Sequence, residues 1–149
     1  MTWFEDFLCE HFLEHLDYTE EVPYFLTECR RVLRENGVLR IIVPDAEKYM
    51  RAYVNGGCEE LSAIRSFEAD GKDPWLKCNY NTRMELINAV FRQGAQHKFA
   101  YDYETLDFLL KRFGFRMVKR QSFGKSAMPE LCIDTEARAS ENLYVEGIK

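Results

Sequence analysis

The sequence predicts an α/β fold built around a parallel sheet, and three consecutive features support this prediction. Residues 23–34 form an amphipathic helix whose apolar side chains share one stripe. Asn36-Gly37 then supplies a helix stop, because glycine accepts the left-handed conformation found there. Residues 38–43 read Val-Leu-Arg-Ile-Ile-Val, a nearly continuous apolar run that is typical of a strand covered on both faces. Helix, tight turn and buried strand together make half of a doubly wound unit.

The N-terminal segment supports two interpretations. Between residues 3 and 16 the apolar side chains follow helical spacing. A strand over the first part, ending near Glu10, is the competing interpretation, and the sequence leaves both open.

The remaining elements follow from caps, breakers and periodicity. Pro44-Asp45 ends the buried strand, Asn55-Gly56-Gly57 ends the next helix, and Asp102 and Gly114 bound a later helix. The expected helices cover 46–54, 61–67, 83–93 and 103–113, the expected strands cover 115–123 and 143–148, and residues 130–142 are expected to form a loop.

Composition limits the class of protein. The 149 residues suit a single domain, residues 1–149, with an irregular insertion at 56–82. A net charge of −5 with scattered basic residues argues against a nucleic-acid partner. No apolar run approaches the ~20 residues that cross a bilayer, so we expect no membrane partner. Five widely spaced cysteines without a Cys-x-x-Cys pair indicate reduced thiols and a cytoplasmic protein.

The stretch from His11 to His15 spells His-x-x-Glu-His, a pattern that also occurs in zinc hydrolases. On a helix, the two histidines would stand one turn apart and could share a Zn²⁺, with Glu14 as the base on a metal-bound water. Such a site needs a third ligand, and nothing in the sequence selects one. The sequence therefore assigns no metal site, and a zinc hydrolase remains an alternative. The possible third ligands are Glu59, Glu60, Glu68 and Glu85.

A second block, RRVLRENGVLRIIVPD at residues 30–45, resembles a known family. It is similar to the part of class I S-adenosylmethionine-dependent methyltransferases where a helix ending in R-V-L-x-x-G-G leads into the fifth strand, although Asn36 replaces one glycine. Residues 10–16 resemble the end of the family's fourth strand and the loop beyond it. Residues 97–115 and 140–146 resemble its last helix, its sixth strand and, for a bacterial subgroup of predicted methyltransferases, its seventh strand. The order and spacing of these blocks agree.

The resemblance implies a partial Rossmann-like methyltransferase sheet of about strands four to seven with flanking helices. Family members hold S-adenosylmethionine beside a glycine-rich turn after the first strand, in analogy to dinucleotide-binding folds. This sequence contains no Gly-x-Gly, and only about twenty residues precede its first predicted helix, whereas one βαβ unit needs roughly 30. We therefore expect the glycine-rich half to be lacking and the chain not to bind the cofactor alone.

The resemblance also implies roles for residues at the strand ends. His15 or His97 would act as the catalytic base toward a methyl acceptor. Two positions have a structural alternative, because Asp45 can cap the next helix and His97 can lie in a surface loop. The implied cofactor-binding residues are Glu10, His11, Glu14 and Pro44, and the implied substrate-binding residues are Asp45 and Tyr101.

A fourth strand without its neighbour would be prone to association. We expect a homodimer that buries the N-terminal apolar segment, with Phe4, Phe7, Leu8 and Phe12, or that pairs along a strand edge. Three functions follow as hypotheses. The chain is a methyltransferase-like binding or interaction module without catalysis, an active methyltransferase completed by an oligomer or partner chain, or a zinc hydrolase.

Overall fold

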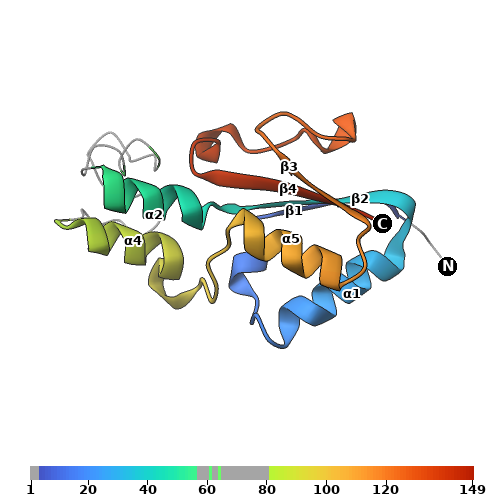
Figure 1. Ribbon diagram of the computed structural model, residues 1–149, viewed down its shortest axis with the longest axis horizontal. Helices are drawn as coiled ribbons and strands as arrows, with labels where there is room; N and C mark the ends of the chain where they lie inside the picture. Colours follow the sequence, from blue (N-terminus) through green and yellow to red (C-terminus); the bar gives the residue numbers. More distant parts are fainter. Residues whose placement is uncertain (1–3, 57–60, 62–63, 65–80) are drawn as a thin grey trace.

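The computed structural model describes residues 4–56, 61, 64 and 81–149, which form a mixed four-stranded sheet with flanking helices (Figure 1). The strands are β1 (Phe4–Glu10), β2 (Leu33–Pro44), β3 (Met117–Gln121) and β4 (Asn142–Ile148). The helices are α1 (Glu21–Val32), α2 (Ala46–Asn55), α4 (Arg83–Arg92) and α5 (Tyr103–Arg112). Short 3-10 turns occur at Leu13–His15, Gln93–Ala95, Pro129–Leu131 and Glu136–Arg138.

The strand order is β1-β2-β4-β3, and one of the three pairings is parallel. β1 runs parallel to β2, and α1 provides the crossover that such a pair needs. β4 lies antiparallel to both β2 and β3. The α/β prediction is confirmed, whereas the expectation of a parallel sheet holds for β1 and β2 alone.

β1 decides between the two interpretations of the N-terminal segment in favour of the strand. Residues 6–10 pair in register with residues 38–42, and this pairing outweighs the helical spacing of the apolar side chains. Adjacent side chains of a strand point to opposite faces, so Phe7 and Leu8 do not share one apolar stripe. Phe7 packs against the core, while Phe4 and Phe12 remain 47% and 45% exposed.

Asn36 and Gly37 lie inside β2 and do not form the predicted glycine turn directly after the helix. Asn36, not Gly37, takes the left-handed conformation, with φ of 66°. Gly37 is needed for another reason, because a Cβ atom there would lie 2.6 Å from the carbonyl oxygen of Glu5. The prediction that Gly37 supplies the positive φ was wrong, and its real role is the close approach of β1 to β2.

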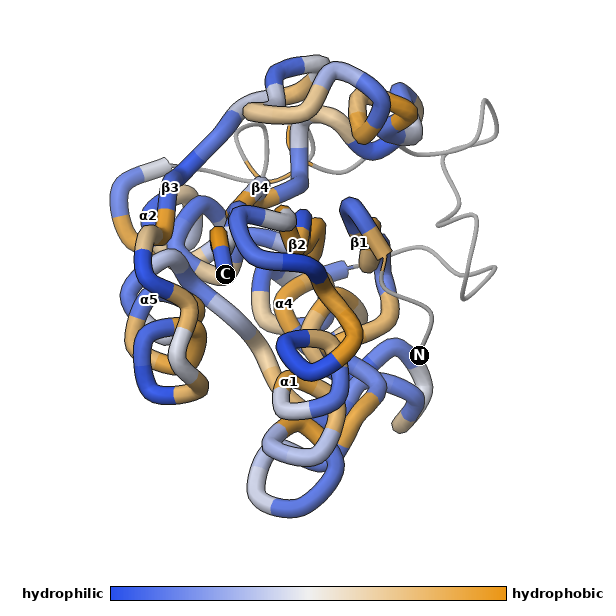
Figure 2. The backbone as a smooth tube through the Cα atoms, turned by 90° about the vertical axis from the view of Figure 1, so that its right-hand side faces the viewer, coloured by the Kyte–Doolittle hydropathy of each residue, from blue (hydrophilic) through white to orange (hydrophobic). Residues whose placement is uncertain are grey.

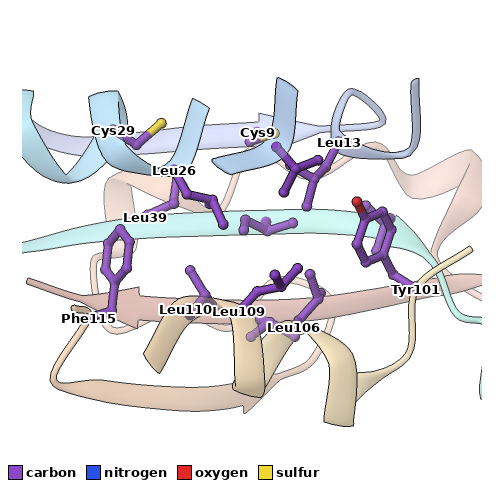
Figure 3. Close-up of a cluster of buried hydrophobic side chains, with 14 of the residues drawn as sticks. Cys9, Leu13, Leu26, Cys29, Leu39, Tyr101, Leu106, Leu109, Leu110 and Phe115 are labelled. Carbon is purple, nitrogen blue, oxygen red and sulfur yellow. The ribbon is translucent and has the colours of Figure 1, made fainter. Parts of the chain in front are cut away.

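The main core lies between the sheet and the pair α1 and α5, which share one side of the sheet (Figure 1). Figure 3 shows Leu39 of β2 between Leu26 of α1 and the leucines of α5. In Figure 2 these helices carry both polar (blue) and apolar (orange) residues, as expected for helices with one buried face. A second, smaller cluster joins α2 and α4 through Tyr49, Ala52, Leu61, Leu86 and Val90.

The opposite side of the sheet is covered by the 122–141 connection between β3 and β4 (Figure 1). Arg40 of β2 binds Asp134 of this connection at 2.7 Å and Glu146 of β4 at 3.0 Å, and all three side chains are at most 1% exposed. Burial alone would lower the pKa of Arg40, but the two carboxylates outweigh burial and raise it. Arg40 therefore stays charged and attaches the connection to the sheet.

The caps agree with the sequence. Asp45 caps α2, Asp102 caps α5, and Gly114 follows α5 with φ of 87°. Cys9 and Cys29 are buried free thiols, and Cys132 is a partly exposed free thiol. Within the described ranges, no helix combines the length and the apolar character that crossing a bilayer requires. Most of the irregular insertion expected at 56–82, and of the helix expected at 61–67, lies outside the described residues.

Candidate functional site

Residues 97–101 cross the carboxyl ends of the parallel strands β1 and β2. The backbone N–H of Lys98 donates to the carbonyl of Glu14 at 2.7 Å, just beyond β1. The N–H of Ala46 donates to the carbonyl of Tyr101 at 2.9 Å, just beyond β2. These bonds hold His97 and Tyr101 over the edge where open α/β sheets bind ligands.

A small cavity of about 10 Å³ lies at this edge. Its lining includes Glu14, Pro44, His97 and Tyr101, four of the residues that the sequence assigned to cofactor, substrate or catalysis. The Tyr101 hydroxyl is buried, and its oxygen has no hydrogen-bond partner among the described residues. Burial raises the pKa of this hydroxyl, which therefore stays protonated near neutral pH.

His15 and His97 lie against each other at the same edge, with ring centroids 4.8 Å apart and ring planes at 85°. Nδ1 of His15 lies 3.1 Å from the carbonyl of Gln96, and Nδ1 of His97 lies 2.7 Å from the carbonyl of Val90. A carbonyl can only accept, so each Nδ1 carries the proton and each neutral ring keeps a lone pair on Nε2. Burial lowers the pKa of His97, which favours its neutral form.

Glu14 is the third side chain in the group formed with His15 and His97. Its side chain is 2% exposed, and Oε1 lies 3.2 Å from Nδ1 of His11. Oε2 is buried without a hydrogen-bond partner among the residues that the structure describes. Glu14, His15 and His97 each offer one ligand atom within 4.8 Å of those of the other two.

This grouping differs from the His-x-x-Glu-His interpretation. His11 has a left-handed φ of 47°, and Leu13–His15 is a single 3-10 turn, so His11 and His15 do not occupy one helical face. The premise of the zinc hydrolase was therefore wrong. His11 contacts Glu14 and Arg138 instead. Of the proposed third ligands, Glu85 belongs to the capping box of α4, and Glu59, Glu60 and Glu68 lie outside the described residues.

Two other predicted site residues have structural contacts. Glu10 accepts a hydrogen bond from the N–H of Thr135 at 3.1 Å. Asp45 is fully buried, caps α2 and binds Arg120 at 2.9 Å. Its alternative interpretation as a helix cap is confirmed. The alternative for His97, a surface loop residue, was wrong, because His97 is 8% exposed.

The described residues at this edge do not enclose a cavity of the size of S-adenosylmethionine. Pockets for such ligands enclose roughly 300–1,000 Å³, whereas the cavity encloses about 10 Å³. The chain also contains no Gly-x-Gly turn that would let its backbone approach a cofactor. We therefore derive no reaction step through this cofactor.

Comparison with solved structures identifies the type of fold. A SAM-dependent methyltransferase from Archaeoglobus fulgidus superposes with a TM-score of 0.54 at 20% identity, over 99% of this chain and 60% of that protein. A protein named a "putative O-methyltransferase", from Nostoc punctiforme PCC 73102, superposes with a TM-score of 0.51 at 11% identity, over 99% of this chain and 32% of that one. The chain thus has a Rossmann-like methyltransferase fold and spans less than two thirds of either neighbour.

Comparisons of the sequence add no assignment. No protein family model matches the chain, and no curated protein matches it. The similarity to methyltransferases is therefore one of fold, and an activity needs its own support from the site.

Proposed function

We propose that this chain is a methyltransferase-like unit that does not bind S-adenosylmethionine alone and acts by associating through the open edge of β1. One observation carries the proposal. Among the strands that the structure describes, β1 stands at the edge of the sheet and pairs with β2 alone, whereas the methyltransferases of similar fold extend over a longer chain. The small cavity at the strand ends also supports it, because the space that the described residues enclose there is far below cofactor size.

The chemistry of β1 favours association. An edge strand offers a row of N–H and C=O groups to another strand. Carboxylates on an edge strand usually oppose such pairing, but those of β1 already have partners. Glu5 binds Arg34 at 2.8 Å, Asp6 accepts from the N–H of Val38 at 3.1 Å, and Glu10 accepts from Thr135. The exposed rings of Phe4 and Phe12 add apolar area at the two ends of the strand.

A second copy of this chain is the proposed occupant of the edge. Two β1 strands related by a twofold axis would pair antiparallel and join both sheets into one. The N–H of His11 donates to Ile42 of β2, so by alternation the N–H of Leu8 faces outward, to the open side. A proline at position 8 would remove an outward donor without removing a bond to β2.

Sedimentation velocity over a dilution series tests this association. We expect a dimer for the wild type and a monomer for Leu8→Pro. Leu8→Ala is the matched control, since it removes the same side chain but keeps the N–H, and it should remain dimeric. A monomeric wild type at micromolar concentration, or an equally stable dimer of Leu8→Pro, would contradict the proposed interface.

Calorimetric titration with S-adenosylmethionine tests the lack of autonomous cofactor binding. We expect no binding heat at millimolar cofactor. Micromolar binding would overturn this part of the proposal and favour the alternative, an active methyltransferase whose pocket is completed by an oligomer or partner chain. Repeating the titration with Leu8→Pro separates these cases, because a pocket completed by the dimer would lose its affinity in the monomer.

A further inference from the structure

We propose that Glu14, His15 and His97 bind one divalent transition-metal ion, with Zn²⁺ as the best fit to their donor atoms. This site goes beyond the proposed association through β1 and does not depend on it. It also differs from the His-x-x-Glu-His interpretation, because His97 replaces His11 as a ligand.

The spacing of the three side chains suits one ion. Their ligand atoms lie within 4.8 Å of one another. Zinc binds nitrogen and oxygen at about 2.0–2.1 Å, so neighbouring ligands of a tetrahedral site lie roughly 3.3 Å apart. Small rotations of the side chains would close this difference, and His15, the partly exposed member, has the most room to move.

The surroundings of each ligand match what metal sites require. Metal-binding histidines usually donate their other ring N–H to a carbonyl or carboxylate, which fixes the tautomer and the ring orientation. Here Nδ1 of His15 and Nδ1 of His97 both meet backbone carbonyls, at 3.1 Å and 2.7 Å. Nε2 of each ring is thereby left as the ligand atom. Glu14 is positioned by His11, whose Nδ1 lies 3.2 Å from Oε1, and Oε2 is left for the ion.

The charge balance provides an independent reason. A buried carboxylate oxygen without a partner is costly unless a cation or a donor compensates it. The Nδ1 atoms of His15 and His97 are directed to the Gln96 and Val90 carbonyls and not to Glu14. The nearby ammonium of Lys98 is directed to Glu21 at 2.9 Å instead. A divalent cation would be coordinated by Oε2 of Glu14 and by Nε2 of both His15 and His97.

The donor set also indicates which ion would fit. Two imidazole nitrogens and one carboxylate oxygen form a common three-residue zinc set, which leaves a fourth position for water. The cavity of about 10 Å³ beside Glu14 and His97 is close to the minimum space for one water molecule. Tyr101 lines the same cavity, and its buried hydroxyl, which has no partner among the described residues, is a candidate hydrogen-bond partner for such a water. Mg²⁺ and Ca²⁺ prefer all-oxygen sites and are disfavoured.

The test uses the full chain, stripped of metal with a chelator and titrated with Co²⁺, whose absorption spectrum reports its coordination. We expect one equivalent to bind, with the intense visible bands of a four-coordinate nitrogen and oxygen site and no thiolate charge-transfer band. Zn²⁺ should displace it in a competition titration. Binding of no Co²⁺ or Zn²⁺, or a thiolate band that indicates cysteine ligands, would overturn the proposal.

Asparagine variants identify the ligands. His15→Asn and His97→Asn keep a side-chain N–H near the Gln96 and Val90 carbonyls but remove Nε2. Each should weaken binding by at least about 100-fold, because the loss of even an outer partner costs 10–100-fold. Glu104→Gln, which changes an exposed carboxylate on α5 outside the trio, should leave the affinity unchanged. Wild-type affinity in both asparagine variants would overturn the assignment.

A measurement without substitutions covers the case in which a variant fails to fold. Nitrogen-15 spectra of the histidine rings in the wild-type chain should show Nε2 of His15 and His97 shifting on addition of Zn²⁺. Nε2 of His11 should not become a ligand. A spectrum in which the rings of His15 and His97 do not respond to Zn²⁺ would contradict the site.

Discussion

The carbonyl oxygen of Glu5 lies 2.6 Å from the position that a Cβ atom would occupy on Gly37. Because the carbonyl belongs to the backbone and the position of a Cβ atom is fixed by the backbone of residue 37, Gly37→Ala must push β1 away from β2. We expect a loss of about 1–3 kcal/mol in the free energy of unfolding, the usual cost of overpacking. Urea denaturation measures it. Asn36→Gly is the neighbouring control and should stay within about 1 kcal/mol of wild type, since glycine accepts the left-handed conformation. Equal stability of Gly37→Ala and wild type would show that the two strands separate without cost.

Arg40 holds the 122–141 connection on the sheet through a fully buried ion pair. Arg40→Met would leave Asp134 and Glu146 without their cation, and breaking such a pair costs about 3–5 kcal/mol. Arg34→Met is the control, because the Arg34–Glu5 pair is exposed and such pairs contribute about 0–1 kcal/mol. Chemical denaturation of both variants gives the comparison. Similar losses in the two would mean that the buried charges remain compensated by water.

The buried ring of His97 makes stability depend on pH. Burial lowers its pKa in the folded chain below the usual value of about 6.5 that applies to the unfolded chain. Between these two values the unfolded state binds more protons, so stability falls as the pH drops below about 6.5 and levels off below the folded pKa. Thermal unfolding of the chelator-treated chain from pH 7.5 to 5 measures this loss. His97→Asn should show a smaller loss over the same window, and an identical pH profile would contradict the assignment.

Burial also protects two thiols. It raises the pKa of Cys29 to about 12 and raises that of Cys9 as well. Neither forms the reactive thiolate at neutral pH. Alkylation of the native chain followed by peptide mapping should label Cys132 and leave both buried thiols unmodified until denaturant is added. Labelling of Cys9 at the rate of Cys132 would show that β1 opens readily from the core.

The elements with local signals could be predicted from sequence. Asp45, Asp102 and Gly114 bound their helices as expected, because caps and left-handed stops depend on neighbouring residues. The conformation of residues 4–10 could not be decided locally, since the pairing with β2 determines it. Similarly, Arg40 sits in an apolar run, and its partners Asp134 and Glu146 are distant in sequence.

The candidate site was predictable only in part. Glu14 and His15 stood out as part of a motif. The third motif residue, His11, contacts Oε1 of Glu14 and is not one of the three clustered side chains. His97 joins them because residues 97–101 cross the ends of two strands, an arrangement that no local pattern encodes. The resemblance implied that His97 faces the methyl acceptor, whereas in the structure its ring packs against His15 next to Glu14, which is the grouping behind the proposed metal site.

The insertion of β4 between β2 and β3 imposes an order on folding. Only α1 separates β1 from β2 in the sequence, so these two strands can pair early. β2 and β3 are both paired with β4, and they can form these pairings only when residues 142–148 are available. Pairings between distant segments form slowly. During synthesis, the edge of β2 that later pairs with β4 would remain unpaired after β1, α1 and β2 have formed. This edge would then be accessible to another chain or to a chaperone. The pairing of β4 with β2 and β3, in the middle of the sheet, is thus the last to form.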